Sequence, residues 1–466
     1  MKQFFFLLFF VLKIIFNAEA RIELPAILGS GMVLQQRSEV PIWGRARANF
    51  MVKVKPSWDT RTYTVKSDGE GNWRVLIKTP SAGGPYNISI TDDEKITLSD
   101  VLTGEVWVCS GQSNMEMPMK GFSNQPTLHS NDIVTEAANN SLRLFQVQRA
   151  VSVRPEYSCE GRWQVSSPES ALSFSAIGFQ FGKRLQEILK VPVGIIQSTW
   201  GGTPIEAWMD KESILRFSER QIPVPGADAK ADRLETTCLF NAMINPIVGY
   251  GIKGFLWYQG ETNVPRASEY ADLMTLMVTG WRRLWKQDSL SFYYVQIAPW
   301  NYGAKKEAAP YLREAQYNAL SLISNSGMVV SMDKGSSTTI HPSDKTTISN
   351  RLLYWALGDT YHVKGIAYQS PYFEKIVFKK DTAVLTFKNT PNGFTSNDEE
   401  ITGFQVAGAD RVFHEARAKI VKNTIEVINS EVKNPVAVRY AFTDIIKTNL
   451  YSVEGLPVAP FRTDNW

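Results

Sequence analysis

A serine on a tight turn is the first residue of this chain whose surroundings indicate chemistry. Ser113 stands in Gly111-Gln112-Ser113-Asn114-Met115, directly after the apolar run at residues 105–109. Between a strand end and a helix start, a serine hydroxyl is held outward with backbone N–H groups nearby, as nucleophilic acyl transfer requires. The residues that follow do not match the Gly-x-Ser-x-Gly elbow. Taken alone, the pattern predicts equally well that Ser113 is a helix N-cap.

A nucleophilic serine needs a base, and the sequence holds only four histidines. Imidazole has a suitable pKa for this role near neutral pH. His129 lies in an irregular stretch, His362 follows the last predicted helix, and His414 lies in a C-terminal β segment. His341 alone stands in a loop after a predicted parallel strand. We therefore predict His341 as the base, although a lone histidine is more often a hydrogen-bonded structural residue.

Glycines and polar groups crowd two further loops that follow predicted strands. In the loop 197–208, the glycine pair 201–202 lets the backbone approach a ligand, so Gly202 is a candidate oxyanion donor. A turn that needs a positive φ explains the pair equally well. The loop after the strand at residues 254–258 carries two amides and a carboxylate: Gln259, Asn263 and Glu261. Polar groups at a strand end are expensive unless they are used.

These loops need a common scaffold, and the middle of the chain alternates strand patterns with helix patterns. Predicted strands lie at residues 105–109, 192–196, 254–258, 292–297 and 328–332. Predicted helices lie at residues 177–189, 273–284, 312–323 and 343–357. Such alternation predicts a parallel sheet covered by helices on both faces, with ligands bound outside the carboxyl ends of the strands.

The two ends of the chain have a different pattern, which is typical of β structure. Short β-forming runs separated by Gly, Pro, Asn and Asp turns predict an antiparallel β domain at residues 21–103. Strand periodicity returns at residues 361–466, after a predicted central domain at residues 104–360. The stretch 121–140 has little periodicity and predicts a surface loop or insertion.

The first twenty residues are typical of a secretory signal. Lys2 precedes an apolar run from Phe4 to Ile15 that only Lys13 interrupts, and Ala18-Glu19-Ala20 matches a small-x-small cleavage site. The run is shorter than the roughly 20 apolar residues that a membrane span requires. We expect an exported protein, periplasmic or extracellular, whose mature chain begins near Arg21 and has no membrane span.

Composition narrows the class of partner. The formal charge is +4, from 50 basic and 46 acidic residues, without a block rich in Lys and Arg, so a nucleic-acid partner is disfavoured. The three cysteines match no zinc spacing, and we expect neither a metal nor an organic cofactor. Aromatic residues make up 12% of the chain, and their flat apolar faces suit carbohydrate ligands.

Four loops together closely resemble the sialate O-acetylesterase family: Gly111-Gln112-Ser113-Asn114-Met115, Trp200-Gly201-Gly202-Thr203-Pro204-Ile205-Glu206, Trp257-Tyr258-Gln259-Gly260-Glu261 and Ile340-His341-Pro342-Ser343-Asp344-Lys345. That family is similar to the SGNH hydrolases, three-layer α/β/α enzymes with serine nucleophiles. The resemblance spans about residues 104–357, and the flanking β segments also look like those of related bacterial enzymes. It implies Ser113 as nucleophile and His341 as base. It also implies an oxyanion hole of the Ser113 and Gly202 N–H groups with a side-chain amide.

Two departures from the wider SGNH pattern leave alternatives open. Those enzymes often place an aspartate three residues before the histidine, where this chain has Thr338. The protein could work as a Ser-His dyad, or recruit one of three acids: Glu261, Asp333 or Asp344. The third loop also lacks the usual Gly-x-Asn-Asp, so either Gln259 or Asn263 could supply the oxyanion amide, and we favour Gln259.

The resemblance implies an exported carbohydrate O-acetylesterase that acts first on O-acetylated sialic acids. Acetylated xylan or xyloglucan is an alternative substrate for the same mechanism. A second class is a carbohydrate-binding protein without turnover, which the intact Ser113 and His341 disfavour. A third is a glycosidase that uses paired acids among Glu116, Glu206 and Glu261, and it leaves the serine and the histidine unexplained.

Overall fold

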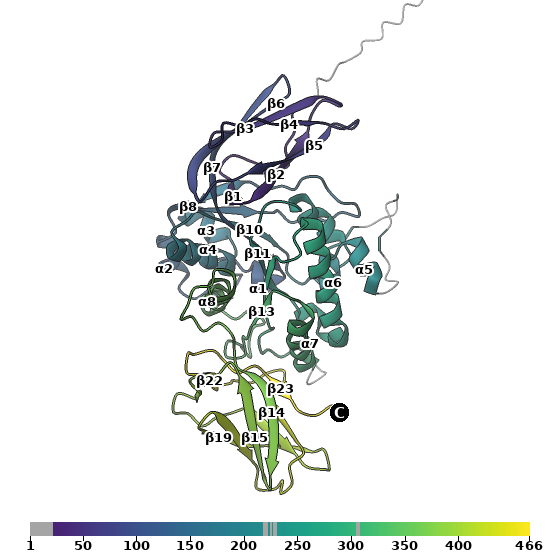
Figure 1. The fold of residues 1–466 in the computed structure, drawn as a ribbon. Coiled ribbons are helices and arrows are strands. Elements are labelled where there is room, and N and C mark those ends of the chain that lie inside the picture. The colour runs from purple at the N-terminus through teal and green to yellow at the C-terminus, as the bar shows by residue number, and fades with distance from the viewer. Residues whose placement is uncertain (1–21, 218–221, 224–225, 227–230, 304–307) are drawn as a thin grey trace, which may run out of the picture.

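The computed structural model describes residues 22–217, 222, 223, 226, 231–303 and 308–466. The expected signal segment at residues 1–20 lies outside them. Figure 1 shows three parts along the long axis: a β-rich part, a sheet flanked by helices, and a second β-rich part. Within the described ranges, no helix is long and apolar enough to cross a membrane.

Parallel strands form the middle part in the order β13-β12-β11-β7-β10-β8, and β9 pairs antiparallel with β8 at the edge. Their bounds are β7 (Lys95–Gly111), β8 (Asn139–Gln146), β9 (Trp163–Ser166), β10 (Val193–Thr199), β11 (Gly254–Tyr258), β12 (Ser291–Val295) and β13 (Ser326–Val329). β7, β10 and β11 are buried over their shared length. Burial on both faces explains their continuous apolar sequence.

Helices cover both faces of this sheet. α4 (Ala176–Leu189) and α8 (Lys345–Trp355) lie on one face, and α6 (Ala267–Trp285) and α7 (Ala308–Leu322) lie on the other (Figure 1). Along β7 the side chains alternate: Val106 and Val108 belong to the core that contains α6, whereas Trp107 and Cys109 belong to the core that contains α4 and α8. The predicted α/β class is confirmed, because alternate residues of each strand bury against opposite helical layers.

Strand β7 joins the first part to the second. Its early residues pair antiparallel with β6, and its later residues enter the parallel sheet. The other strands of the first part are β1 (Val33–Gln35), β2 (Glu39–Arg45), β3 (Met51–Pro56), β4 (Tyr63–Lys66), β5 (Asn72–Lys78) and β6 (Gly83–Thr91). The boundary predicted between residues 103 and 104 falls inside β7. A side chain on Gly104 would collide with the carbonyl oxygen of Pro192, so glycine is required there.

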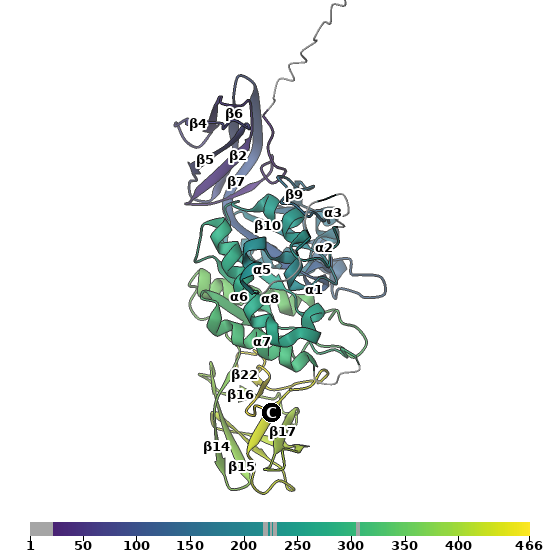
Figure 2. The same cartoon turned by 90° about the vertical axis from the view of Figure 1, so that its right-hand side faces the viewer.

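The C-terminal part consists of antiparallel sheets ordered β14-β15-β20-β19, β18-β17-β21-β23 and β16-β22 (Figure 2). The bounds are β14 (Tyr372–Lys379), β15 (Thr382–Lys388), β16 (Phe394–Thr395), β17 (Phe404–Ala407), β18 (Phe413–Glu415), β19 (Arg417–Val421), β20 (Thr424–Ile428), β21 (Ala437–Tyr440), β22 (Tyr451–Ser452) and β23 (Phe461–Arg462). Arg313 and Glu314 of α7 bind this part: Arg313 donates to the carbonyl oxygens of Thr443 and Asp444, and Glu314 accepts from Arg462.

Short helices sit mainly in the loops at the sheet edges. They are α1 (Ser113–Glu116), α2 (Ser130–Thr135), α3 (Pro168–Ser173), α5 (Lys211–Phe217) and the 3₁₀ or π turns η1 (Ile205–Trp208), η2 (Phe240–Ile244), η3 (Asn245–Ile247), η4 (Glu261–Arg266) and η5 (Ala356–Thr360). The stretch 121–140 contains α2 and the start of β8. The turn before α2 reaches the end of the sheet where the predicted site residues lie.

Candidate active site

The serine loop is shaped by one glycine and one short helix. β7 ends at Gly111, whose φ of +134° and contact with the Tyr258 backbone exclude a side chain. Gln112 then adopts an extended conformation and is the N-cap of α1, so the alternative role of Ser113 as N-cap is wrong. Ser113 is the first residue of α1. Its N–H therefore has no intrahelical acceptor, and its side chain is partly exposed.

The structure brings the predicted nucleophile and base together. His341 Nε2 lies 2.7 Å from Ser113 Oγ, which is the range for proton transfer to a general base. Burial, followed by the positive charge of Lys345, lowers the pKa of His341 to about 4. The imidazole is therefore neutral near pH 7, and it can accept the proton of the serine hydroxyl.

The other ring nitrogen of His341 contacts a residue that the sequence did not point to. His341 Nδ1 lies 2.5 Å from Gln125 Oε1, and Thr339 Oγ1 lies 2.9 Å from the same oxygen. Thr339 Oγ1 accepts the His341 backbone N–H, so its own proton is available for Gln125. Because an amide oxygen only accepts, this contact places the imidazole proton on Nδ1 and leaves Nε2 free to accept.

The turn that carries Gln125 is held by backbone hydrogen bonds within itself and to the loop that carries His341. Phe122 and Gln125 exchange backbone hydrogen bonds of 2.9 and 3.0 Å, and the Leu128 N–H donates to the Ser343 carbonyl at 3.0 Å. The Phe122 ring meets the His341 ring edge-on, with centroids 5.2 Å apart. Neither periodicity nor residue type marks this turn in the sequence, because glutamine is not a usual partner for a catalytic histidine.

Glu261, the first candidate for a third catalytic member, contacts Asn114 rather than His341. Its Oε1 accepts from Asn114 Nδ2 at 2.6 Å, while Asn114 Nδ2 also donates to the Ile340 carbonyl at 3.1 Å. Asn114 Oδ1 in turn accepts from Lys345 Nζ at 2.7 Å. Burial raises the pKa of Glu261 and lowers the pKa of Lys345 to about 7. Glu261 thus supports the loop one residue before the base.

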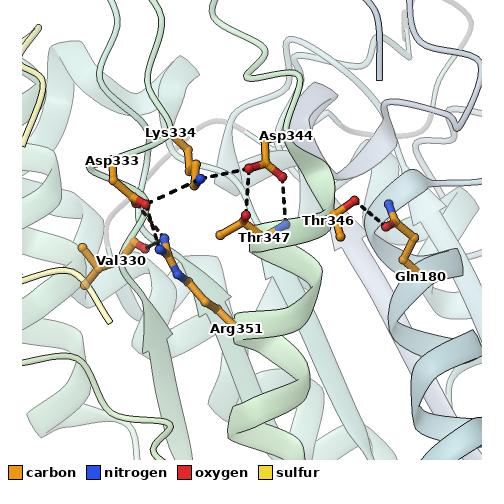
Figure 3. Close-up of polar contacts among 8 residues, drawn as sticks. All are labelled: Gln180, Val330, Asp333, Lys334, Asp344, Thr346, Thr347 and Arg351. Atoms are coloured by element: carbon orange, nitrogen blue, oxygen red, sulfur yellow. Dashed lines mark hydrogen bonds and ion pairs between the residues drawn. The ribbon is translucent and has the colours of Figure 1, made fainter. Parts of the chain in front are cut away.

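The two other acids nominated for this role bind cations and a helix start (Figure 3). Asp333 makes a paired contact with Arg351, at 2.7 and 2.8 Å. Asp344 is the N-cap of α8, accepts from the Thr347 N–H at 2.9 Å, and lies 2.9 Å from Lys334 Nζ. Neither carboxylate bonds to His341 among the contacts of the described residues.

The glycine pair lies directly against the serine. The Gly201 N–H donates to Glu116 Oε2 at 2.8 Å, and Glu116 is ion-paired with Arg149. A Cβ on Gly201 would stand 3.0 Å from Ser113 Cβ, so the backbone passes very close to the nucleophile. Gly202 follows with a φ of +68° that favours glycine. This geometry suits Gly202 as an oxyanion donor and also satisfies the alternative of a turn with positive φ.

The two candidate amides differ in how many of their N–H hydrogens already have an acceptor. Gln259 Nε2 donates to the Thr203 carbonyl at 3.0 Å and to Asn263 Oδ1 at 2.7 Å, so both of its hydrogens are committed. Asn263 Nδ2 donates to Glu206 Oε2 at 2.9 Å, and its second hydrogen has no acceptor among the described residues. Both side chains are fully buried.

Glu206 is also ion-paired with Arg266, and Glu116 with Arg149, so the acids proposed for a glycosidase serve other contacts.

Metal chemistry has no evident ligand set in the part of the chain that the structure describes. There, no group of three or more His, Cys, Asp and Glu side chains could hold a metal ion. Cys109, Cys159 and Cys238 are free thiols, and burial raises the pKa of each.

Residues 103–353 match the family model described as carbohydrate esterase, sialic acid-specific acetylesterase. The sialate O-acetylesterase of Homo sapiens is 28% identical over 389 residues, covering 75% of this chain and 73% of that protein. The Rattus norvegicus sialate O-acetylesterase is 28% identical over 413 residues, covering 74% of each. A crystal structure of a carbohydrate acetylesterase from Xanthomonas citri aligns with a TM-score of 0.87 at 35% identity, covering 96% of this chain and 100% of that one.

The geometry around Asn114 predicts that Glu261→Gln lowers stability more than turnover. Glutamine keeps an oxygen for Asn114 but removes the negative charge that balances Lys345, at a cost of about 1–3 kcal/mol. We expect a lower thermal midpoint and a kcat on a small acetyl ester within about tenfold of wild type. Glu105→Gln, which alters another buried hydrogen-bonded carboxylate, is the matched control for stability alone. A collapse of kcat at an unchanged midpoint would instead make Glu261 part of the catalytic unit.

Proposed function

We propose that this chain, which belongs to the carbohydrate esterase family of sialic acid-specific acetylesterases, releases acetate from O-acetylated sugars through an acetyl-enzyme on Ser113. Family membership makes the protein an esterase, and thereby a hydrolase. The observation that carries the serine mechanism is the 2.7 Å contact between Ser113 Oγ and His341 Nε2. It joins a nucleophile to a neutral base.

The reaction proceeds in two halves. Ser113 Oγ attacks the ester carbonyl carbon while its proton moves to His341 Nε2. The bond from that carbon to the sugar oxygen then breaks, and His341 gives the proton to the departing alcohol. Water repeats the sequence on the acetyl-enzyme, with His341 again as base, and acetate leaves. No metal or organic cofactor enters these steps.

Negative charge on the carbonyl oxygen is met by backbone donors at the serine. The Ser113 N–H stands at the open start of α1, and Gly202 N–H follows the glycine that packs on Ser113. For the side-chain donor, the contacts favour Asn263 over Gln259, because of these two amides, within the described part of the chain, only Asn263 has a side-chain hydrogen without an acceptor. Gln259 then holds the Thr203 carbonyl and Asn263 in place.

Gln125 completes the unit as a positioning residue. Its amide oxygen holds the Nδ1 proton of His341, a task usually given to a carboxylate. The imidazolium formed during attack is therefore stabilised by a dipole rather than by a full negative charge. Glu261 acts indirectly: it accepts from Asn114, which also donates to the carbonyl of Ile340, the residue before His341.

O-acetylated sialic acids are the substrate that the family description names, and acetylated neutral glycans are the second candidate. We also propose export through the segment at residues 1–20, with a periplasmic or extracellular site of action. Acetate release from acetylated sialic acid and from acetylated xylo-oligosaccharides, measured side by side, tests the substrate.

Replacing the nucleophile is the direct test of the mechanism. We expect Ser113→Ala to lower kcat on para-nitrophenyl acetate by about 10⁴-fold or more, because one member of the catalytic unit is removed. The thermal midpoint should stay near that of wild type, since Ser113 Oγ bonds only to His341 among the described side chains. Retention of most activity in purified Ser113→Ala would refute the acetyl-enzyme.

The low pKa of His341 predicts the acid limb of the pH profile. A general base must be neutral, and the pKa of His341 is lowered to about 4 by burial and by Lys345. We expect kcat/KM, which reports the free enzyme, to stay level as the pH falls to about 6 and to reach half its plateau near pH 4 to 5. An acid limb at the ordinary histidine pKa of about 6.5 would contradict this environment.

Two substitutions at Gln125 distinguish the orientation of the His341 ring from the effect of a negative charge beside it. Gln125→Ala removes the Nδ1 acceptor, so kcat should fall by about 10–100-fold with little change in KM for a small ester. Gln125→Glu keeps an acceptor and adds a negative charge, which raises the pKa of His341 and moves the acid limb of kcat/KM to higher pH. Gln405→Ala, in β17, is a control that should change neither. Unchanged kcat in Gln125→Ala would remove Gln125 from the unit.

A further inference from the structure

Three successive backbone N–H groups follow β10, and they differ in their acceptors. The Trp200 N–H donates to the Gly111 carbonyl at 3.1 Å, and the Gly201 N–H donates to Glu116 Oε2 at 2.8 Å. The Gly202 N–H has no acceptor among the described residues, and Gly202 is exposed. The first two bonds therefore fix the chain immediately before an N–H group that is open to a substrate.

A pair of glycines does not hold such a donor in place by itself. Glycine has the widest φ/ψ freedom of all residues, so the peptide between Gly201 and Gly202 can turn its N–H away from the nucleophile. A side chain at 201 would crowd the site, because its Cβ would stand 3.0 Å from Ser113 Cβ and 3.1 Å from Glu116 Oε2. The hydrogen bond to Glu116 supplies the restraint that the glycine backbone lacks. An oxyanion donor is most effective when it is oriented before the reaction.

Glu116 belongs to the same short helix as the nucleophile. α1 begins at Ser113 and ends at Glu116, whose own N–H donates to the Gln112 carbonyl at 2.9 Å. The side chain of Glu116 is only 10% exposed. One helical turn thus joins Ser113 to the loop that carries Gly202, and it sets the distance between the nucleophile and the donor.

Arg149 balances the charge that this arrangement brings close to the reaction. Ser113 Cβ and Glu116 Oε2 both lie beside the Gly201 backbone, so the carboxylate stands near the place where negative charge develops during attack. An unpaired anion there would oppose that charge. Arg149 Nη2 lies 2.6 Å and Arg149 Nε 2.7 Å from Glu116 Oε1, and the guanidinium lies over the Trp200 ring, 5.5 Å from its centroid. The carboxylate can therefore hold Gly201 without presenting a free negative charge.

We propose that Glu116 is a positioning residue that orients the Gly202 N–H toward the oxyanion, and that Arg149 balances its charge. The proposal rests on the proposed function, since it concerns the tetrahedral intermediate formed on Ser113. It gives a task in ester cleavage to a carboxylate that makes no bond to His341 in the described part of the chain.

Glu116→Ala tests the orientation of the donor. On para-nitrophenyl acetate we expect kcat to fall about 10–100-fold, with KM changed less than about threefold, because the donor is misplaced and not removed. Methylboronic acid forms an O–B bond with Ser113 Oγ while the hydroxyl proton passes to His341, and the adduct is tetrahedral and negative like the intermediate. Its Ki should rise by about the same factor as kcat falls. Glu116→Gln keeps an oxygen for the Gly201 N–H and should bring kcat and Ki to within about threefold of wild type.

A merely structural role of Glu116 gives a different pattern. A smaller folded fraction lowers the apparent kcat but leaves the Ki of methylboronic acid unchanged, and that outcome would overturn the proposal. The acid limb of kcat/KM should also stay in place in Glu116→Ala, since the base keeps its contacts with Ser113 and Gln125.

Arg149→Ala tests the charge balance, and it does so even where Glu116→Ala does not fold, because Arg149 is 53% exposed. The variant leaves the carboxylate unpaired beside the developing charge, so we expect kcat to fall about tenfold. Arg149→Ala combined with Glu116→Gln carries neither charge, and its kcat should return to within about threefold of Glu116→Gln alone. A double variant no faster than Arg149→Ala overturns the role assigned to Arg149.

Asp100→Ala is the matched control, because it removes another carboxylate that pairs with an arginine, Arg143, at 2.6 and 3.1 Å. It should lower the thermal midpoint and change neither kcat nor the Ki of methylboronic acid. Unchanged kcat and Ki in folded Glu116→Ala overturn the proposal, as does an equal loss in Glu116→Gln. Those outcomes leave the proposed function standing, whereas full turnover in Ser113→Ala overturns the acetyl-enzyme and, with it, this proposal.

Discussion

The side-chain amide of Asn114 ties together the three loops on which the site depends. It sits one residue after the nucleophile and bonds Glu261 at the end of β11, the Ile340 carbonyl before the base, and Lys345 at the start of α8. An amide can donate and accept at once, which neither a carboxylate nor an ammonium group can do. The distance between Ser113 and His341 is thus fixed by a bond network beneath them, not by their own contact alone.

This network carries an electrostatic consequence for the base. A cation buried to 1% exposure at Lys345 stands near the imidazole and, with burial, keeps the ring neutral. Glu261 supplies the opposite charge at a distance, through Asn114, and its Oε2 has no hydrogen-bond partner in the ranges that the structure describes. A buried pair of this kind is expensive to assemble. Its retention here is explained by the position and protonation state of the base rather than by stability.

Sequence patterns pointed to Ser113 and His341, which follow strands of the parallel sheet, but they did not point to Gln125, which contacts His341. Ser113 and His341 each follow a strand of the parallel sheet, and the carboxyl ends of such strands meet, so their proximity follows from periodicity. Gln125 comes from an irregular turn whose path is set by backbone contacts to Phe122 and Ser343, which leave no periodic signal. Glu261 is a candidate third member because it is acidic and follows a strand of the sheet. A place after a strand predicts where the residue lies, but not which side chain it contacts. The partner of a buried carboxylate is decided by packing.

The boundary between the first β part and the central sheet is another feature that the sequence pattern does not reveal. Its turns and alternation predict antiparallel strands, yet β7 passes from that part into the central sheet without a break. A strand that changes partners along its length has one continuous pattern, and so no sequence feature marks the change. A side chain at Gly104 is excluded by Pro192 at the crossing point, which fixes the strands there.

A neutral partner for the histidine suits the chemistry of an ester. With the pKa of His341 lowered to about 4, the ring is a weak base, and Gln125 adds no negative charge to strengthen it. An alkoxide leaves an ester far more readily than an amine anion leaves an amide, so a modest base is sufficient when the oxyanion is well stabilised. In the proposed mechanism, most of the transition-state stabilisation then comes from the donors beside Ser113, where Gly201 brings the backbone close to Ser113 and Gln259 binds Asn263. Under this proposal, the fold favours catalysis through preorganised donors more than through the strength of the base.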